Sequence, residues 1–378
     1  MPFEHYIRSG AKLLRCGYTT GTCAALAAAG ATGLLLRGEV PETLAVTTPK
    51  GWTVEVEPVF CRQEGEAAVC AVRKDAGDDP DVTDGMLILA RVSKLPDGIR
   101  IDGGEGVGRV TKPGLDQPVG AAAINSIPRK MIRESAEAVC ADCAYRGGLE
   151  IVISVPEGRE AAKKTFNSQL GIEGGISILG SSGIVEPMSE RALVETTALE
   201  IRQAAAAGAK RLILLPGNYG MEFLTGQLPE LAAVPRAKCS NYIGEAIDSA
   251  RLEKFEEVLL VGHIGKLVKL AGGIMNTHSK TADCRRELFV AHAALCGAPA
   301  GVCRALMNEV SSDGCLRVLE EAGLRSAVME SLLSAVQAAI TRRAGDMRIG
   351  ALLFSLELGL LGTTDEAVQI LEKWRTEP

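Results

Sequence analysis

The segment VLLVGHIG, from Val258 to Gly265, decides the fold, because four consecutive apolar residues are followed at once by glycine-rich turn residues. A short apolar run without alternation is typical of a strand that is buried on both faces of a parallel sheet. Similar runs occur at Ile151–Val155, Ile176–Leu179 and Leu212–Leu215, with helical stretches between them. The pattern predicts a Rossmann-like α/β domain over residues 148–378, with a parallel sheet and a C-terminal helical extension.

The preceding residues, 1–147, show a different pattern. Polar and apolar side chains alternate at positions 52–57, as they do in a half-solvated antiparallel strand. The Ala- and Leu-rich stretch Thr22–Leu36 predicts a buried helix, and Pro128 suits the first position of another helix. Residues 1–147 are therefore predicted to form an α+β domain with an antiparallel sheet.

Composition excludes several classes of partner. The chain has 378 residues, a net charge of −6 and only 4% aromatic residues, with no basic stripe, which argues against nucleic acid. Apolar runs such as Leu212–Leu215 fall far short of the ~20 residues that a membrane span needs. The N-terminus shows no secretory signal, so we expect a cytoplasmic protein without a membrane partner. The sequence is compatible with a homo-oligomer.

The cysteine and histidine spacings do not predict a metal site. Eleven cysteines are scattered through regular segments, so the expectation is reduced, mostly buried thiols. Cys140 and Cys143 form a C-x-x-C pair without a second pair or a nearby histidine. The four histidines lack metal-ligand spacing.

Turn residues follow each apolar run of the predicted parallel sheet. In open parallel sheets, ligands bind beyond the carboxyl ends of the strands, so these loops form the candidate pocket. The Gly180–Gly183 loop suits close backbone approach, and Glu186 suits a ribose-like diol. His263 directly follows its strand and suits proton transfer or ligand hydrogen bonding, with a satisfied loop histidine as the alternative.

For three other motifs, a purely structural role is an alternative to ligand binding. Gly104–Gly108 resembles a nucleotide loop, but a strand and a turn follow it where the dinucleotide fingerprint needs a helix. Lys74–Asp81 holds four carboxylates, which suit either a solvated turn or a loop facing a cationic ligand. Lys112, Arg129 and Lys266 belong to local basic excesses that suit a polycarboxylate ligand or plain solvated surface.

Several long motifs resemble one family, the cobalt-precorrin-5B C1-methyltransferases of the CbiD type. The matching segments span most of the chain in order: Gly17–Ala25, Lys74–Thr83, Gly106–Leu115, Ala123–Ile132, Gly180–Pro187, Pro216–Asn218 and Gly262–Ser279. One departure is Ser126, where proline is expected.

The resemblance implies methyl transfer from S-adenosylmethionine to C1 of cobalt-precorrin-5B, giving cobalt-precorrin-6A in cobalamin (vitamin B12) synthesis without oxygen. Cobalt then arrives inside the tetrapyrrole substrate. The residues assigned to the methyl donor are Gly180, Ser181, Ser182, Gly183, Glu186, Pro216, Gly217, Asn218, Gly262 and Gly265. Those assigned to the substrate are Thr19, Thr20, Gly21, Thr22, Asp75, Asp78, Asp79, Lys112, Arg129 and Lys266, with His263 as the catalytic candidate.

Three other functions remain open at this point. A small-molecule kinase would need a phosphate-binding context that Gly104–Gly108 lacks. A non-enzymatic corrinoid carrier would bind the tetrapyrrole but not S-adenosylmethionine. A methyltransferase that acts on another substrate shares the same chemistry.

Overall fold

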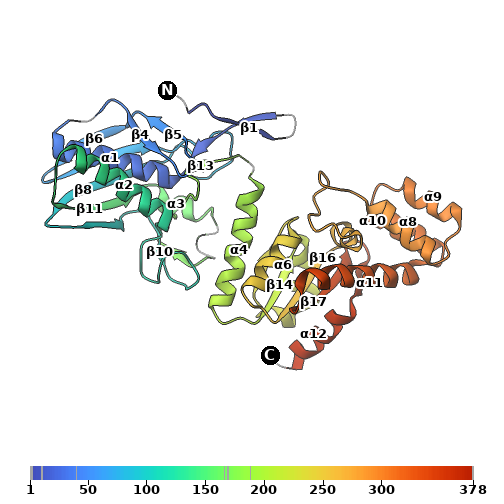
Figure 1. Cartoon of the computed structure of the whole chain (residues 1–378). Coiled ribbons are helices and arrows are strands. Elements are labelled where there is room, and N and C mark those ends of the chain that lie inside the picture. Colours follow the sequence, from blue (N-terminus) through green and yellow to red (C-terminus); the bar gives the residue numbers. More distant parts are fainter. Residues whose placement is uncertain are drawn as a thin grey trace. The chain divides into compact units, whose positions relative to one another are not determined.

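The computed structural model describes residues 3–9, 12–39, 41–165, 167, 170–187 and 189–376. The chain divides into two compact units, Met1–Ser189 (unit 1) and Glu190–Pro378 (unit 2), which are coloured in sequence order in Figure 1. The predicted domain boundary at residue 147 therefore falls inside unit 1. The physical reason is that strand β11 (Gly148–Ser154) pairs with two strands of unit 1, antiparallel with one and parallel with the other.

Unit 1 is built on a five-stranded sheet in the order β6-β7-β8-β11-β9. The other strands of this sheet are β6 (Phe60–Glu64), β7 (Ala67–Arg73), β8 (Leu87–Leu95) and β9 (Ile99–Gly103). Neighbouring strands are antiparallel except for β11 and β9, which run parallel. The predicted antiparallel sheet is thus present, and it takes in one apolar run that was expected in the second domain.

Two helices, α1 (Thr20–Arg37) and α2 (Ser126–Asp142), pack against each other and contribute to the core that the sheet also lines (Figure 1). Five of the six alanines of α1 are fully buried, and small side chains allow its backbone to approach its neighbours closely. Pro128 is the third residue of α2 and not its first, because Asn125 is the N-cap. Cys61 and Cys70 face each other on β6 and β7 and form a disulfide, so the expectation of reduced thiols fails for this pair.

Four small pairings complete unit 1. Strands β1 (Tyr6–Ser9) and β2 (Lys12–Arg15) form a hairpin, as do β4 (Leu44–Thr47) and β5 (Thr53–Val56). Strand β3 (Gly17–Tyr18) pairs with β13 (Ile184–Val185), and β10 (Arg109–Val110) pairs with β12 (Ile172–Glu173). A short helix, α3 (Gly158–Ala162), follows β11. The predicted strand Ile176–Leu179 is reduced to isolated bridges with residues of unit 1.

Unit 2 contains a second five-stranded sheet in the order β15-β14-β16-β17-β18. Its strands are β14 (Arg211–Leu215), β15 (Arg236–Lys238), β16 (Glu257–His263), β17 (Arg348–Ser355) and β18 (Gly359–Thr363). The first four strands in this order are parallel, and β18 is antiparallel to β17. The apolar runs at Leu212–Leu215 and Val258–Val261 thus form adjacent parallel strands.

Helices cover both faces of this sheet. One face packs against α5 (Tyr219–Gln227), the 3-10 helix η1 (Pro229–Leu231) and α12 (Asp365–Thr376). The other face packs against helices that include α4 (Glu190–Ala206), α6 (Ile243–Leu252), α7 (Ile264–Leu267) and α11 (Arg325–Ala344). The 3-10 helix η2 (Val268–Gly272) and helices α8 (Arg285–Leu295), α9 (Ala300–Asn308) and α10 (Ser312–Glu321) lie between β16 and β17 in the chain (Figure 1).

The chain is therefore a mixed α/β protein. No helix within the described residues combines the length and apolar character needed to cross a membrane.

Candidate functional site

At the start of α1, three threonines hold the loop that the sequence analysis assigned to the methyl donor. Thr19 is the N-cap, and its Oγ1 accepts a hydrogen bond from the Thr22 N–H at 3.2 Å. The Thr22 hydroxyl donates to the Gly183 carbonyl at 2.6 Å. The Thr20 hydroxyl accepts from the Leu179 N–H at 3.0 Å, and the Gly21 N–H donates to the Leu179 carbonyl at 3.1 Å. Thr19–Thr22, predicted to bind substrate, thus hold Gly180–Gly183 in place.

Gly180 is required for this close approach. Its φ of +135° is rarely adopted by other residues, and an ideal Cβ would lie 2.3 Å from the Thr19 Oγ1. The glycines of this loop are therefore explained by packing within unit 1. The loop lies in unit 1, whereas the prediction placed it at the edge of the second domain's parallel sheet.

The polar side chains of the same loop also have partners within unit 1. Glu186 forms an ion pair with Lys50, whose Nζ lies 4.1 Å from the ring centroid of Trp52. The Ser182 hydroxyl donates to the Ile184 carbonyl at 3.0 Å, whereas Ser181 is exposed. The carboxylate that was predicted to accept from a ribose therefore already has a cationic partner.

The acidic loop of unit 1 is bound by Arg15. The Arg15 guanidinium donates to both oxygens of Asp75, at 2.6 and 2.8 Å, and its backbone N–H donates to Asp78 at 2.7 Å. Burial opposes ionisation of Asp75, but the bonds from Arg15 and the Gly77 N–H lower its pKa. Asp79 follows in the same loop. Two of the three carboxylates predicted to face a cationic ligand thus accept hydrogen bonds from this chain's own groups.

Arg129 also serves unit 1 itself. Its guanidinium donates to the carbonyl oxygens of Ile124 and Ile101, both at 2.8 Å, and of Ala122 at 3.2 Å. Burial lowers the pKa of Arg129. This side chain therefore ties α2 to β9, while Lys112 lies just beyond β10.

The parallel sheet of unit 2 has a topological switch point between β14 and β16. From β14 the chain passes through α5 on one face and returns as β15, and from β16 it passes to β17 on the opposite side of the sheet. Ligands of open α/β sheets bind in the crevice outside the carboxyl ends of two such strands. Two predicted loops flank this point: Pro216, Gly217 and Asn218 after β14, and Gly262, His263, Ile264 and Gly265 at the end of β16.

Lys266 lies beside the first of these loops. The φ of Gly217 is +116°, and an ideal Cβ at this glycine would lie 3.5 Å from the Lys266 Nζ. Lys266 donates to the Ser240 carbonyl at 3.1 Å. Burial lowers the pKa of Lys266, and the like charge of Lys269 acts in the same direction. Lys266 was predicted to bind substrate, and the structure groups it with a loop predicted for the methyl donor.

His263 is held as a neutral hydrogen-bond donor. It is the N-cap of α7, and its Nδ1 accepts from the Gly265 N–H at 3.1 Å, which leaves the proton of the neutral ring on Nε2. Burial lowers its pKa, although the charge of Asp313, whose Oδ2 lies 3.9 Å from Nε2, opposes this shift. The lone pair that a base would use is thus already engaged.

Three polar residues near His263 were missed by the sequence analysis. The Ser355 hydroxyl, at the end of β17, donates to Asp313 in the first turn of α10. The Ser312 hydroxyl is buried and has no hydrogen-bond partner among the described residues, and it lies 3.6 Å from an ideal Cβ at Gly265. The helix-start pattern at Ser311 was a readable signal for α10. The position of α10 beside His263 could not be predicted from the sequence, because the two segments are far apart in the chain.

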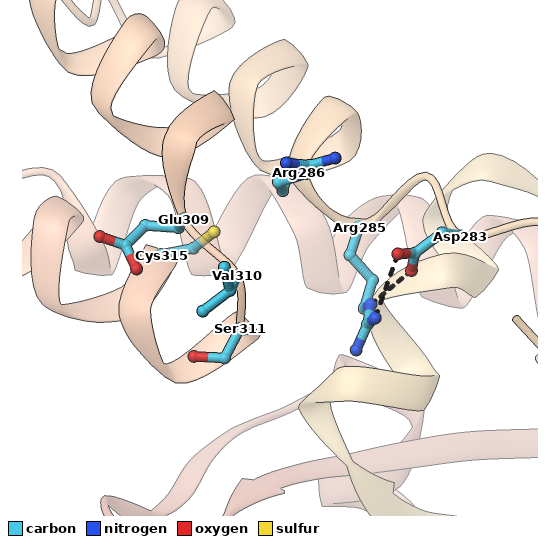
Figure 2. Close-up of a pocket in the computed structure, with 7 residues that line it drawn as sticks. All are labelled: Asp283, Arg285, Arg286, Glu309, Val310, Ser311 and Cys315. Atoms are coloured by element: carbon cyan, nitrogen blue, oxygen red, sulfur yellow. Dashed lines mark hydrogen bonds and ion pairs between the residues drawn. The ribbon is translucent and has the colours of Figure 1, made fainter.

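A separate pocket of about 240 Å³ lies between the starts of α8 and α10, and none of the predicted site residues lines it (Figure 2). Arg285 donates to both oxygens of Asp283, at 2.5 and 3.1 Å. Arg286 donates to the Met307 carbonyl at 3.0 Å. Glu309, Val310, Ser311 and Cys315 form the opposite wall (Figure 2). Each arginine of the pocket is thus bonded to a group of the chain itself.

These features define a mixed α/β protein in which two glycine-containing loops follow adjacent parallel strands, at the sheet edge where open α/β sheets bind ligands. Two family models match the chain: CbiD over residues 7–187, and the C-terminal domain of CbiD over residues 276–365. The chain belongs to the CbiD family.

Curated relatives agree with this assignment. A protein of Ruminiclostridium cellulolyticum named cobalt-precorrin-5B C(1)-methyltransferase is 49% identical over 354 residues, which is 93% of this chain and 92% of that one. A protein of Alkaliphilus metalliredigens with the same name is 42% identical and covers 99% of this chain and 98% of its own. A crystal structure of the cobalamin biosynthesis protein cbiD from Archaeoglobus fulgidus is 33% identical, covering 74% of this chain and 87% of that one, with a TM-score of 0.40.

Proposed function

We propose that this chain transfers a methyl group from S-adenosylmethionine to C1 of cobalt-precorrin-5B, giving cobalt-precorrin-6A in cobalamin biosynthesis. The observation that carries the proposal is the 49% identity, over more than nine-tenths of both chains, to a relative named for this C(1)-methyltransferase activity. The chain is thus a methyltransferase and not a kinase or a carrier. Cobalt belongs to the substrate.

The methyl donor binds in the crevice between β14 and β16, on a Rossmann-like sheet. S-Adenosylmethionine supplies a methyl group on a positively charged sulfur, together with a nucleoside and an amino-acid moiety. In support, Gly217 brings backbone close to the crevice at a φ of +116°, and α5 and α7 begin at its two sides. The same two loops contain Pro216, Asn218, Gly262 and Gly265.

His263 donates a hydrogen bond from Nε2 into this crevice. Methyl transfer to a ring carbon forms one C–C bond, breaks one S–C bond and leaves one proton to be released. His263 is not arranged to take that proton, since its Nδ1 accepts from the Gly265 N–H. Its contribution is orientation of a ligand acceptor, and the released proton passes to solvent.

Unit 1 supplies the second group of motifs. A contact of Ser181 or Glu186 with the methyl donor, and of Lys112 or the Asp75–Asp79 loop with the tetrapyrrole, stays a prediction. In support, Ser181 is exposed. Against a donor contact, Glu186 already pairs with Lys50, so any role for it requires this ion pair to open.

Turnover tests the activity directly. The purified chain is incubated with cobalt-precorrin-5B and S-adenosylmethionine that is 13C-labelled in its methyl group. We expect S-adenosylhomocysteine and C1-methylated product in equal amounts. Binding of the tetrapyrrole without binding of S-adenosylmethionine would favour the carrier and refute the proposal.

A pair of glycine variants tests the donor site. Gly217→Ala forces a residue with a Cβ to a φ of +116° beside Lys266, so we expect S-adenosylhomocysteine to bind at least tenfold more weakly in calorimetric titration. Gly208→Ala is the matched control, because its φ is also positive, at +87°, its surroundings are open, and it precedes β14 at the opposite edge of the sheet. Equal affinities for the two variants would place the donor elsewhere.

A further inference from the structure

Lys266 carries a charge that the described part of the chain does not neutralise. Its Nζ donates to one carbonyl, that of Ser240, at 3.1 Å, and no described carboxylate lies within ion-pair distance of it. An ammonium has three N–H donors, so two remain. A half-buried cation that lacks a counterion is costly unless a partner arrives.

The groups around Lys266 select for an anion. Gly217 and Ser240 contribute backbone only, and Cys239 is buried and keeps its thiol proton, since burial raises its pKa to about 12. The ammonium group of the neighbouring Lys269 already has partners within the chain. It donates to the Thr277 and Ala282 carbonyls at 3.1 and 2.8 Å, and its Nζ lies 3.6 Å from Asp283. Within the described residues, Lys266 is therefore a half-buried cation beside the loop after β14 that has N–H groups to spare.

We infer that Lys266 binds the carboxylate of the methyl donor's amino-acid moiety. The inference rests on the proposed function and goes beyond it by assigning one ligand group to one side chain. The donor is favoured over the tetrapyrrole because Lys266 lies beside Gly217, where the absence of a side chain leaves room against the loop that follows β14. The acidic arms of the tetrapyrrole are the other source of the same chemistry, and the experiment separates the two.

Two ligands that differ in this carboxylate provide the test. S-Adenosylhomocysteine carries the amino-acid moiety, and 5′-methylthioadenosine lacks it. We expect Lys266→Met to weaken binding of S-adenosylhomocysteine at least tenfold in calorimetric titration and to leave binding of 5′-methylthioadenosine within twofold of the unchanged chain.

Two further variants control for structure and for charge. Lys266→Gln keeps a donor for the Ser240 carbonyl but removes the charge, so it should lose S-adenosylhomocysteine affinity like Lys266→Met, with a melting temperature no lower than that of the unchanged chain. Lys210→Met removes an exposed lysine that lies 3.8 Å from Glu256 at the other edge of the sheet, and we expect it to change neither affinity.

The remaining outcomes are distinguishable. Unchanged S-adenosylhomocysteine affinity in Lys266→Gln, with a raised KM for the tetrapyrrole, overturns the inference and assigns the carboxylate to the substrate. Equal weakening of both nucleosides overturns it in favour of a structural role for Lys266. Binding of neither nucleoside by the unchanged chain overturns the proposed function itself.

Discussion

Glu257 is expected to stabilise unit 2 by about 3 kcal/mol, a loss that Glu257→Gln should reveal. The side chain is 3% exposed at the start of β16. It accepts from Arg348 at 3.0 Å, from Lys373 at 2.9 Å and from the Trp374 indole N–H at 2.7 Å, and so joins β16, β17 and α12. Glutamine keeps the size but turns one acceptor oxygen into an NH2 group that faces these donors.

The magnitude follows from the exposure of the partners. Removing one member of a buried ion pair costs about 3–5 kcal/mol, because the other member stays buried and unpaired. The lower end of this range applies because the Arg348 and Lys373 side chains are 40% and 41% exposed. For a unit of this size the loss corresponds to a fall in melting temperature of roughly 6–12 °C.

The two tryptophans make the assay specific for one unit. Trp52 belongs to unit 1 and Trp374 to unit 2. In a Trp52→Phe background, the fluorescence of Trp374 during urea unfolding therefore reports on unit 2 alone. Glu256→Gln is the control, since Glu256 and Lys210 are 64% and 61% exposed and 3.8 Å apart, and we expect a change within about 0.5 kcal/mol.

The pH dependence separates charge from packing. Burial raises the pKa of Glu257, but the bonds from Lys373 and Trp374 and the charge of Arg348 bring it below the ordinary 4.5. A carboxyl with a lowered pKa stabilises the folded state above its unfolded pKa and loses this effect as the pH falls through the folded value. The difference between the unchanged chain and Glu257→Gln should therefore be constant from pH 7 to about 5 and shrink below about 4.5. A loss under 1 kcal/mol at pH 7, or one that persists undiminished at pH 3, would refute the reasoning.

Two further predictions concern the loops. Burial lowers the pKa of His263, so protonation favours the unfolded state and the melting temperature should fall as the pH drops below about 6.5. His263→Asn keeps an acceptor for the Gly265 N–H and should reduce this fall. Parallel curves of melting temperature against pH for the two proteins would contradict the prediction. Gly106→Ala should cost more than about 4 kcal/mol of unit 1 stability, measured through Trp52 in a Trp374→Phe background, because its Cβ would lie 1.8 Å from the Val155 carbonyl oxygen at a φ of +71°. Gly120→Ala, at a φ of +89° in open space, should cost only about 1–2 kcal/mol, and equal costs would show that backbone strain alone explains Gly106.

The features that the sequence predicts well are those decided by neighbouring residues. The predicted helix Thr22–Leu36 is α1, which begins after the Thr19 cap and ends at Gly38, in the left-handed region at a φ of +76°. Threonine caps and glycine stops act within one turn, so their signals are readable from a few residues. The same holds for β5, which lies within positions 52–57, where polar and apolar side chains alternate.

Strand pairing could not be read in the same way. The run Ile151–Val155 is apolar because β11 is a central strand of the sheet in unit 1, with β8 on one side and β9 on the other. A strand in that position has the same composition as a strand of a parallel sheet. The partner strand depends on contacts between residues fifty or more positions apart, and no local signal distinguishes the two cases.

In the candidate site, too, the locally determined features could be predicted and the contacts between distant segments could not. The turn residues at Pro216–Asn218 and at Gly262–Gly265 could be placed at strand ends from the apolar runs before them, and the structure has them at two adjacent strands. The grouping of Lys266 with Gly217 and Ser240 could not be predicted, because each residue follows a different strand.

The two edges of the unit 2 sheet differ in how completely their charges are paired. At the amino edge, Glu257 has three donors around one carboxylate. At the carboxyl edge, Lys266 has one carbonyl partner, and the Ser312 hydroxyl is buried without a partner among the described residues. Incomplete pairing lowers stability, so the spare N–H groups of Lys266 and the unpaired Ser312 hydroxyl are expected at the edge where open α/β sheets bind ligands if a ligand completes their pairing. The two edges should then respond in opposite ways: Glu257→Gln should lower the stability of unit 2 without changing its affinity for S-adenosylhomocysteine, and Lys266→Gln should lower that affinity without lowering the stability.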